Sequence, residues 1–340
     1  MIEFRSDPDK KQWAEFVYNH PHGNIFQTPE MAEVNRHTKN YEPITLAALK
    51  SEEIVALVNA VVIKEMRGSL GQLTARAIIQ GGPLFIDDET GREAVKSLME
   101  HYDAIACKKA IYTQIRNMWD TSYYAFPEGY RYEGHLNFLV DLGKSRDELW
   151  SSLSKSRRYG IKKGLKEGVL IEEIKSLDEI TVAYNLLLAT YKKARIPLAD
   201  ISLFISMFEI LSKKDMGRIF FAKSGDICIG VILILIYKDS IYDWYAGASR
   251  DYLNLYPNDI LPWHAMEWGL KNGFSVFDFG GAGKPDEKYG VRDFKSQFGG
   301  TMQNFGRYEK IYSPNKLWIS KKGLGIYKKI SRLNYVGFSH

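Results

Sequence analysis

Lys50-Ser51-Glu52-Glu53-Ile54 in the first half of the chain is repeated as Lys223-Ser224-Gly225-Asp226-Ile227 in the second half. Each copy follows a short apolar run and precedes a longer one, which covers residues 54–63 in the first half and 227–237 in the second. Two apolar runs joined by a tight polar turn are typical of a β-hairpin. The sequence therefore predicts one hairpin at the equivalent position of each half.

The elements that follow the two hairpins also repeat. A helical pattern over about 90–108 precedes an apolar run at 110–115, and the second half shows the same order at about 259–272 and 276–279. Agreement in hairpin, helix and strand is harder to obtain by chance than a short sequence match. We predict two related α/β domains, each a mixed sheet flanked by helices.

The polar stretch 141–151 is the expected boundary between the halves. At roughly 150 residues per domain, a chain of 340 residues is long enough for two domains. Ser145 and Glu148 have the spacing of a capping box, which predicts a helix that begins there. An amphipathic pattern over 180–191 predicts a longer helix that ends before Pro197.

Composition excludes several classes of protein. Apolar residues make up 45% and charged residues 26%, as in ordinary globular proteins. The longest apolar run is far shorter than the roughly 20 residues of a membrane span, and the N-terminus has no signal-peptide pattern. The two cysteines, Cys107 and Cys228, stand outside any Cys/His cluster, and the seven histidines have no metal-ligand spacing. We therefore expect a cytoplasmic protein without disulfides and without a bound metal.

The net charge of +5 comes from the C-terminal tail. Residues 310–340 hold seven of the 46 Lys and Arg residues and none of the 41 Asp and Glu residues, and aromatic residues are interleaved with them. One interpretation is contact with anionic lipid headgroups or RNA phosphates, which would make the protein membrane-peripheral. The other, which we favour because basic tails are common, is a terminal helix whose aromatic residues pack on the body.

The strongest functional signal lies between residues 277 and 300. The chain reads FDFGGAGKP over 277–285 and YGVRDFKSQFGG over 289–300. Glycines directly after a strand permit positive φ and close approach of the backbone to a ligand, at the strand end where α/β folds bind ligands. The spacing matches neither a Walker loop nor a dinucleotide fingerprint. A ligand-binding loop and a merely tight turn are the two interpretations.

A second basic stretch covers residues 155–163 and includes Arg157, Arg158 and Lys162. One interpretation, which we favour, is the solvated face of a helix. The other is contact with phosphate groups, namely those of the RNA of a donor.

The segment from Asp278 to Gly300 resembles the signature of the Fem family. These are non-ribosomal peptidyl transferases that add amino acids from aminoacyl-tRNA to peptidoglycan precursors. Further similar segments lie at 26–30 (FQTPE), 81–83, 138–142, 158–168 and 257–273. The similarity therefore covers most of the chain.

The resemblance implies two tandem GNAT-like domains, in agreement with the internal repeat. It also implies that the C-terminal segment returns to the first domain. We therefore expect an acceptor-side domain of residues 1–145, completed by 313–340, and a donor-side catalytic domain of residues 146–312. The stretch after Ile180 is too short for the helical arm of some members, so the chain resembles the armless type.

The resemblance also implies roles for individual residues. Lys295 and Phe294 match the Phe-Lys motif of the family, with Lys295 stabilising the oxyanion or holding the terminal RNA phosphate. Pattern alone would make Lys295 a surface residue of a helix. Asp278 either accepts the proton of the amine or caps the loop through backbone hydrogen bonds, and the cap is favoured.

The expected substrate-binding residues come from several segments. Arg292 either binds phosphate or pairs with Asp286 or Glu287. The lysine that binds a nucleotide-sugar pyrophosphate in the family falls at Asn35 here, which puts a UDP-linked acceptor in doubt. The expected set is Gly280, Gly281, Tyr289, Arg292, Lys193, Arg195, Arg36 and Lys39.

Three functions follow from these observations. The first is transfer of an aminoacyl group from aminoacyl-tRNA to an amine of a cell-envelope precursor, by a monomer without a bound cofactor. The second is N-acylation from acyl-CoA, disfavoured because the stretch 249–258 has no glycine for a pyrophosphate loop. The third is non-catalytic binding of RNA or membrane through the tail, which leaves the 277–300 segment unexplained.

Overall fold

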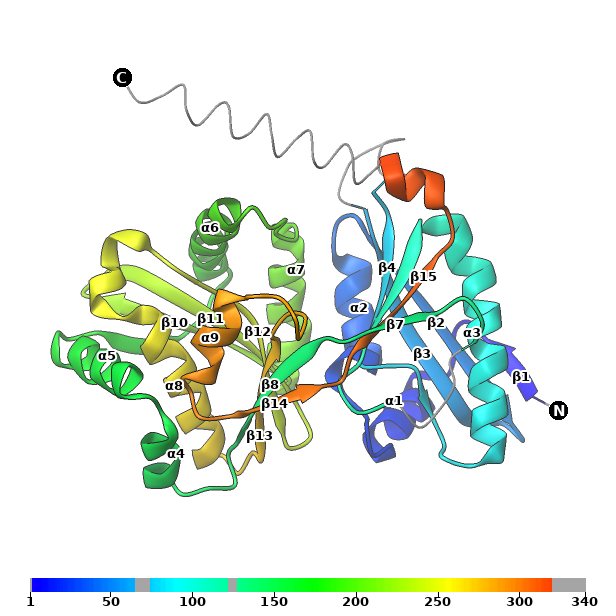
Figure 1. Ribbon diagram of the computed structural model, residues 1–340, viewed down its shortest axis with the longest axis horizontal. Coiled ribbons are helices and arrows are strands. Elements are labelled where there is room, and N and C mark those ends of the chain that lie inside the picture. The colour runs from blue at the N-terminus through cyan, green and yellow to red at the C-terminus, as the bar shows by residue number, and fades with distance from the viewer. Residues whose placement is uncertain (1, 65–73, 122–126, 320–340) are drawn as a thin grey trace.

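The computed structural model describes residues 2–64, 74–121 and 127–319. Its strands form one eight-stranded and one seven-stranded mixed sheet, each in its own lobe of the molecule (Figure 1). The elements of the first lobe are β1 (Ile2–Arg5), α1 (Lys10–Asn19), η1 (Ile25–Gln27), α2 (Pro29–His37), β2 (Tyr41–Lys50), β3 (Glu53–Ile63), β4 (Arg76–Gln80), β5 (Leu84–Phe85), α3 (Glu89–Lys109), β6 (Tyr112–Arg116) and β7 (Arg131–Glu133).

The second lobe is longer by several helices. Its elements are β8 (Leu136–Asp141), α4 (Arg146–Ser152), α5 (Lys155–Lys166), β9 (Leu170–Glu173), α6 (Leu177–Ala194), α7 (Ile201–Ser206), η3 (Met207–Leu211), η4 (Ser212–Lys214), β10 (Gly217–Ser224), β11 (Ile227–Tyr237), β12 (Ser240–Ala248), η5 (Arg250–Leu255), α8 (Pro257–Lys271), β13 (Val276–Gly281), α9 (Gly290–Ser296) and β14 (Thr301–Asn304). The chain then returns to the first sheet as β15 (Arg307–Ile311).

The two sheets have equivalent strand orders. The first runs β1-β2-β3-β4-β6-β15-β7 with β5 beside β3, and the second runs β9-β10-β11-β12-β13-β8-β14. In each sheet one pair is parallel, β4 with β6 and β12 with β13, and the others are antiparallel. The predicted hairpins are β2-β3 and β10-β11, and the predicted crossover helices are α3 and α8. The internal repeat and the tandem GNAT-like fold are thus confirmed.

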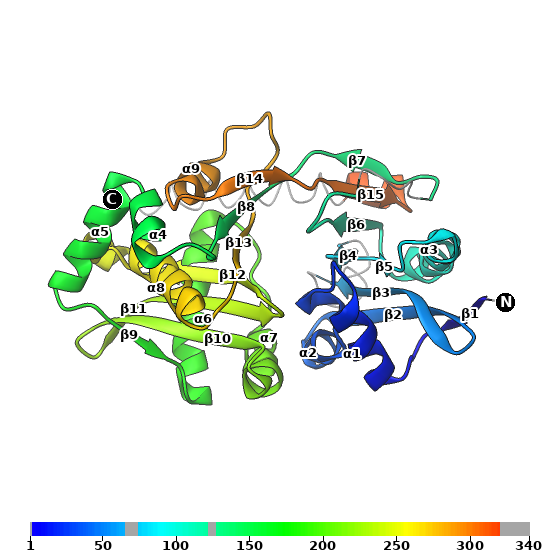
Figure 2. The same ribbon diagram turned by 90° about the horizontal axis from the view of Figure 1, so that it is seen from below.

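The predicted domain boundaries differ from the places where the chain changes sheets. Residues 131–133 belong to the first sheet and 136–141 to the second, while 301–304 belong to the second and 307–311 to the first. The two segments pair antiparallel in one unbroken register, from Thr301 opposite Leu139 to Glu309 opposite Arg131. Figure 2 shows this ribbon passing from one lobe to the other. The crossings therefore lie near residues 134 and 305, rather than at 145 and 312.

The chain returns to the first lobe already at β15 and Tyr312, and the predicted completion of the first domain by residues 313–340 stays a prediction. The Tyr312 hydroxyl lies 2.5 Å from Asp103 Oδ1 and 2.8 Å from Thr113 Oγ1, both in the first lobe. Residues 320–340, which carry most of the basic tail, lie outside the described residues. No helix among the described residues is long and apolar enough to span a membrane.

The Phe-Gln stretch near the N-terminus has a structural role. The Gln27 side chain is fully buried, donates to the carbonyls of Asn59 and Gln80, and accepts from the Asn59 N–H. It thereby fixes η1 to β3 and β4. A Cβ on Gly82 would lie 2.5 Å from the Gln27 side chain, which explains the glycine of the 81–83 segment.

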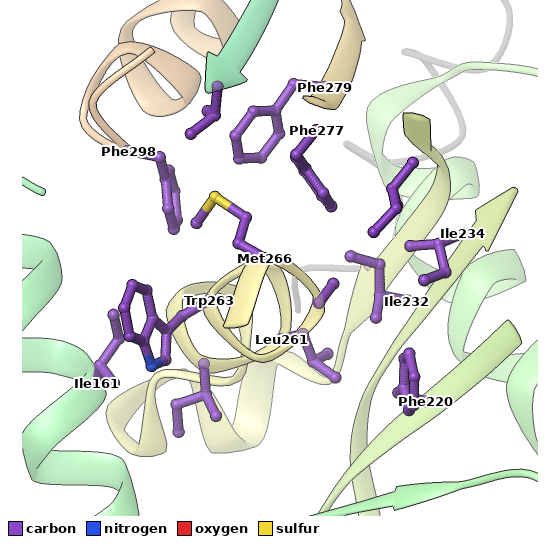
Figure 3. Close-up of a cluster of buried hydrophobic side chains, with 14 of the residues drawn as sticks. Ile161, Phe220, Ile232, Ile234, Leu261, Trp263, Met266, Phe277, Phe279 and Phe298 are labelled. Carbon is purple, nitrogen blue, oxygen red and sulfur yellow. The ribbon is translucent and has the colours of Figure 1, made fainter. Parts of the chain in front are cut away.

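Two apolar clusters hold the site in place. In Figure 3, Met266 of α8 lies beside the rings of Phe277, Phe279 and Phe298, which joins β13 and the segment that follows α9 to the core of the second lobe. A second cluster spans the lobes, because Met31 and Val34 of α2 share it with Phe204 of α7. Burial of apolar surface across the lobes fixes their relative position.

Candidate active site

The site begins where β12 and β13 separate. The two strands pair in parallel for three positions, from Ser240 with Val276 to Tyr242 with Asp278. On its other edge β13 pairs with β8 from Val276 to Gly281, with an irregularity after Asp278, and the ladder between β11 and β12 has an irregularity at Trp244. The next residue of β12 is Asp243, so Asp243 and Asp278 lie at the point where the parallel pairing of β12 and β13 stops. The glycine-rich signature marks Asp278, but no sequence pattern marks Asp243, because only this strand pairing makes the two residues neighbours.

Asp278 is buried, with 6% of its surface exposed, and its Oδ1 accepts from the Gly280 N–H at 2.6 Å. The predicted cap is therefore present. Burial raises the pKa of Asp278 to about 6, although the Gly280 N–H and Lys295 act to lower it. Gly280 has φ of +69°, and a Cβ there would lie 2.7 Å from the Tyr242 hydroxyl, so the turn requires glycine.

Lys295 lies on α9 and points back at the end of β13. Its Nζ donates to the carbonyls of Phe279 at 2.5 Å and Gly281 at 2.8 Å. Burial lowers the pKa of Lys295, while Asp243 and Asp278 act to raise it. Lys295 is half-buried, and not the surface lysine that the pattern alone favours.

Asp243 faces the same ammonium. It is half-buried, and burial raises its pKa to about 6, with Lys295 acting to lower it and Asp278 to raise it further. Two carboxyl groups and one ammonium therefore share the gap between the strands. A carboxyl group with a pKa near 6 is ionised at neutral pH and is still a stronger base than an ordinary aspartate.

The first lobe contributes cations that no sequence motif marks. Arg116 ends β6 and is the register partner of Arg307 on β15. A Cβ on Gly281 would lie 3.4 Å from Arg307 Nη2 and 3.0 Å from the His135 ring, so both side chains reach the β13 terminus. Burial, with help from Arg307 and Arg116, lowers the pKa of His135 to about 4, which keeps this histidine neutral. The crossing ribbon brings these residues to the site, and no local pattern marks them.

Arg292 does not form the predicted ion pair with Asp286 or Glu287, and its predicted phosphate contact stays a prediction. Its guanidinium donates to the carbonyls of Ala282, Lys284 and Pro285 and so holds the glycine-rich loop. No ion pair with Asp286 or Glu287 is present among the described residues. Tyr289 packs against Gly283, where a Cβ would lie 2.8 Å from its ring.

The basic residues of α5 are mostly used within the protein. Arg157 pairs with Asp259, donates to Gln297 Oε1 at 3.1 Å, and lies 4.6 Å over the Phe294 ring. Arg158 donates to the carbonyls of Ser151 and Leu153 at the end of α4. The Lys162 ammonium is exposed and lies 5.7 Å over the Trp150 ring. Arg157 and Phe294 thus connect α5 to α9, and the RNA-binding role of these cations stays a prediction.

The remaining predicted residues lie away from Lys295. Lys193 lines a cavity of about 800 Å³ between α6 and η5, and Arg195 is the exposed left-handed cap of α6. Arg36 pairs with Glu33 on the exposed side of α2, and Lys39 is exposed beside Ser202. Asn35 is buried, with 8% exposed. None of these four cations contacts the loop among the described residues, so their roles stay predictions.

A group of three or more His, Cys, Asp or Glu side chains that could hold a metal ion is absent from the described part of the chain. Cys228 lines the cavity beside α6, and burial raises the pKa of its thiol to about 12.

The comparisons with known proteins agree with this architecture. Residues 151–296 match the model of the acetyltransferase (GNAT) domain family. A lipid II:glycine glycyltransferase of Staphylococcus haemolyticus is 28% identical over 125 residues, which are 35% of this chain and 30% of that protein. A lipid II:glycine glycyltransferase of Staphylococcus epidermidis is 19% identical over 396 residues, covering 88% of this chain and 91% of that protein.

Three solved structures share the fold over nearly the whole chain. A crystal structure of FemX has a TM-score of 0.67 at 16% identity and covers 91% of this chain and 97% of its own. L-PGS from Bacillus licheniformis has a TM-score of 0.57 at 14% identity, with 93% and 97% covered. A tandem GNAT protein from the clavulanic acid pathway has a TM-score of 0.58 at 10% identity, with 93% and 100% covered.

Proposed function

Because the chain belongs to the FemABX-like family of GNAT transferases, we propose that it transfers an aminoacyl group from aminoacyl-tRNA to an amine of a cell-envelope precursor. The observation that carries the proposal is the group of Asp243, Asp278 and Lys295 at the point where the parallel pairing of β12 and β13 stops. It supplies a base and a cation at one opening of the sheet, and both are needed for acyl transfer to an amine.

The reaction is aminolysis of an ester. The amine nitrogen of the acceptor attacks the ester carbon, and a C–N bond forms while the carbonyl oxygen becomes an oxyanion. The tetrahedral intermediate then loses one nitrogen-bound proton, and its ester C–O bond breaks, releasing the ribose hydroxyl of the tRNA. The protein must accept the proton from nitrogen, stabilise the oxyanion and return a proton to the leaving oxygen.

Asp243 is the better candidate for the base. One oxygen of Asp278 is occupied by the Gly280 N–H, and its side chain is almost fully buried. The Asp243 carboxylate accepts no hydrogen bond from the described residues and the residue is half-buried, which leaves the carboxylate open to an amine. We assign Asp278 to holding the loop and the Lys295 ammonium in position, and Lys295 to the oxyanion or the leaving oxygen.

The start of α8 supports a donor other than acyl-CoA. GNAT enzymes that use CoA bind its pyrophosphate at the equivalent helix N-terminus, through free backbone N–H groups. Here the third helical residue is Asp259, which is 5% exposed and pairs with Arg157. The negative charge of the Asp259 carboxylate therefore lies at the positive end of the helix, where a phosphate of CoA would bind. Tyr256, with φ of +59°, stands before Pro257 where a pyrophosphate loop has small residues.

The experiment is a transfer assay with labelled charged tRNA and lipid II, and in parallel with labelled acetyl-CoA. We expect product only from charged tRNA, and we expect Lys295→Met to lower kcat by about 100-fold, the loss typical of one oxyanion donor. Lys108→Met, an exposed lysine of α3, is the matched control and is expected to keep full activity. Transfer from acetyl-CoA alone, or unchanged turnover in Lys295→Met, would reject the proposal.

A further inference from the structure

The two arginines of the first sheet form an unusual pair. Arg116 and Arg307 are register partners on the antiparallel strands β6 and β15. Side chains directly opposite each other in an antiparallel pair have Cβ atoms roughly 5 Å apart, and like charges there are destabilising. Arg76, on β4, adds a third charge that acts on Arg116. The protein therefore holds mutually repelling cations together inside the molecule.

Among the described residues, no carboxylate neutralises this pair. Neither Arg116 nor Arg307 forms a salt bridge with a described residue, and the one side-chain hydrogen bond from Arg116 to a described residue runs from its Nε to Gln114 Oε1 at 2.9 Å. Glu133 acts to raise the pKa of Arg307, but the Glu133 carboxylate is paired with the Lys284 ammonium at 2.5 Å. Burial and the Arg76 charge lower the pKa of Arg116, while burial and the Arg116 charge lower the pKa of Arg307 to about 10.

The pair also faces the proposed site. Arg307 Nη2 reaches the position beside Gly281, whose carbonyl accepts from Lys295 Nζ. Tyr242, register partner of Asp278, carries its hydroxyl beside Gly280 and packs its ring edge-on against Phe26, with centroids 5.1 Å apart. The arginines thus lie on the first-lobe side of the Asp243–Asp278–Lys295 group, across the β13 terminus.

From this arrangement we propose that Arg116 and Arg307 bind an anionic group of the acceptor, and that the acceptor is a carboxylate-bearing amine. The assignment to the acceptor rests on the proposed function. Two planar guanidinium groups side by side suit a carboxylate or phosphate better than a neutral group, because each offers parallel N–H donors. A bound anion also offsets the repulsion between Arg116 and Arg307, so an anion-binding function would explain why the two arginines lie together.

The first experiment measures anion binding without any reaction. Thermal unfolding is followed while glutarate or inorganic phosphate is added to the wild-type chain, Arg116→Gln, Arg307→Gln and Arg131→Gln at constant ionic strength. A ligand that binds only the folded state raises the melting temperature in a saturable way. Arg131, exposed on β7 in the same ribbon, is the matched control.

We expect a saturable rise for the wild-type chain and for Arg131→Gln, and its loss in the other two variants. Without anion, Arg116→Gln and Arg307→Gln are expected to melt at the same or a higher temperature, because the repulsion is gone. A lower melting temperature in both would mean that the arginines stabilise the fold instead. No saturable rise in the wild-type chain, or equal rises in all four proteins, would also overturn the proposal.

The second experiment assigns the anion to its source. In the transfer assay, Arg307→Gln is expected to raise KM for the lipid II acceptor at least tenfold and to leave KM for aminoacyl-tRNA unchanged. A rise confined to aminoacyl-tRNA would assign the pair to a donor phosphate and reject an acceptor carboxylate. If no protein shows transfer, the proposed function fails, while the anion titration still tests the arginine pair independently.

Discussion

At the scale of single residues, the ionisation of Asp243 affects how both stability and catalytic activity depend on pH. Burial raises its pKa from 3.8 to about 6, so the folded protein keeps a proton that the unfolded chain has already lost. The stability contributed by this difference is full below about pH 4 and is lost as pH rises through 6. Catalysis has the opposite requirement, because only the ionised carboxylate accepts a proton.

We therefore predict that kcat/KM rises about tenfold per pH unit up to an apparent pKa near 6 and then levels off. Asp243→Asn is expected to lower kcat/KM at pH 7 by at least 100-fold while its melting temperature stays the same or increases. The measurement is a pH–rate profile of both proteins together with thermal unfolding at pH 7. Reduced activity that merely follows reduced stability would refute the assignment of Asp243 as base.

At the scale of elements, Arg157 joins three helices. It pairs with Asp259 of α8 and stacks on Phe294 of α9, while its own helix is α5. Removing one member of a buried ion pair leaves the other charge unpaired, at a cost of about 3–5 kcal/mol. Arg157→Ala is thus expected to lower the free energy of unfolding by about 3 kcal/mol, whereas exposed Lys162→Ala changes it by less than about 0.5 kcal/mol.

Urea unfolding of these two variants, alongside tRNA binding, separates the two roles of the basic helix. A stability loss in Arg157→Ala without a proportionate loss in tRNA affinity of the folded fraction indicates the structural role. Equal stability of both variants, with weaker tRNA binding in both, would instead favour the phosphate contact predicted from the charge run.

The same scale shows what the sequence can and cannot predict. Hairpins, crossover helices and the Asp278 cap depend on neighbouring residues, so apolar periodicity and turn chemistry reveal them. The apolar pattern of 136–141 predicts a strand but not its sheet, because the sheet is decided by pairing with the distant strands β13 and β14. Arg116 and Arg307 become neighbours only through the return of the chain to the first sheet.

At the scale of the whole molecule, the crossing ribbon joins the two lobes into one folding unit. Its two segments belong to both sheets, and the apolar cluster shared by α2 and α7 adds a second connection. Gly306 lies at the crossing with φ of +70°, and a Cβ there would lie 2.1 Å from the Tyr132 ring. The positive φ alone costs a non-glycine residue about 1–2 kcal/mol, and the overlap adds to it.

Gly306→Val is therefore expected to destabilise both lobes together. Amide hydrogen exchange should accelerate in β8 and β13 of the second sheet as well as in β6 and β15 of the first, because ladder pairs on either side of Gly306 are held by one register. Gly225→Ala is the matched control, since it also replaces a glycine with positive φ but in a hairpin turn with open space around it. Its effect should stay within β10 and β11. Faster exchange in Gly306→Val that is confined to the first sheet would mean that the lobes unfold independently and that the ribbon is only a linker. An intact ribbon also holds the Arg116–Arg307 pair and the Asp243–Asp278 pair in their relative position. We therefore expect the transfer activity of Gly306→Val to fall together with its protection from hydrogen exchange.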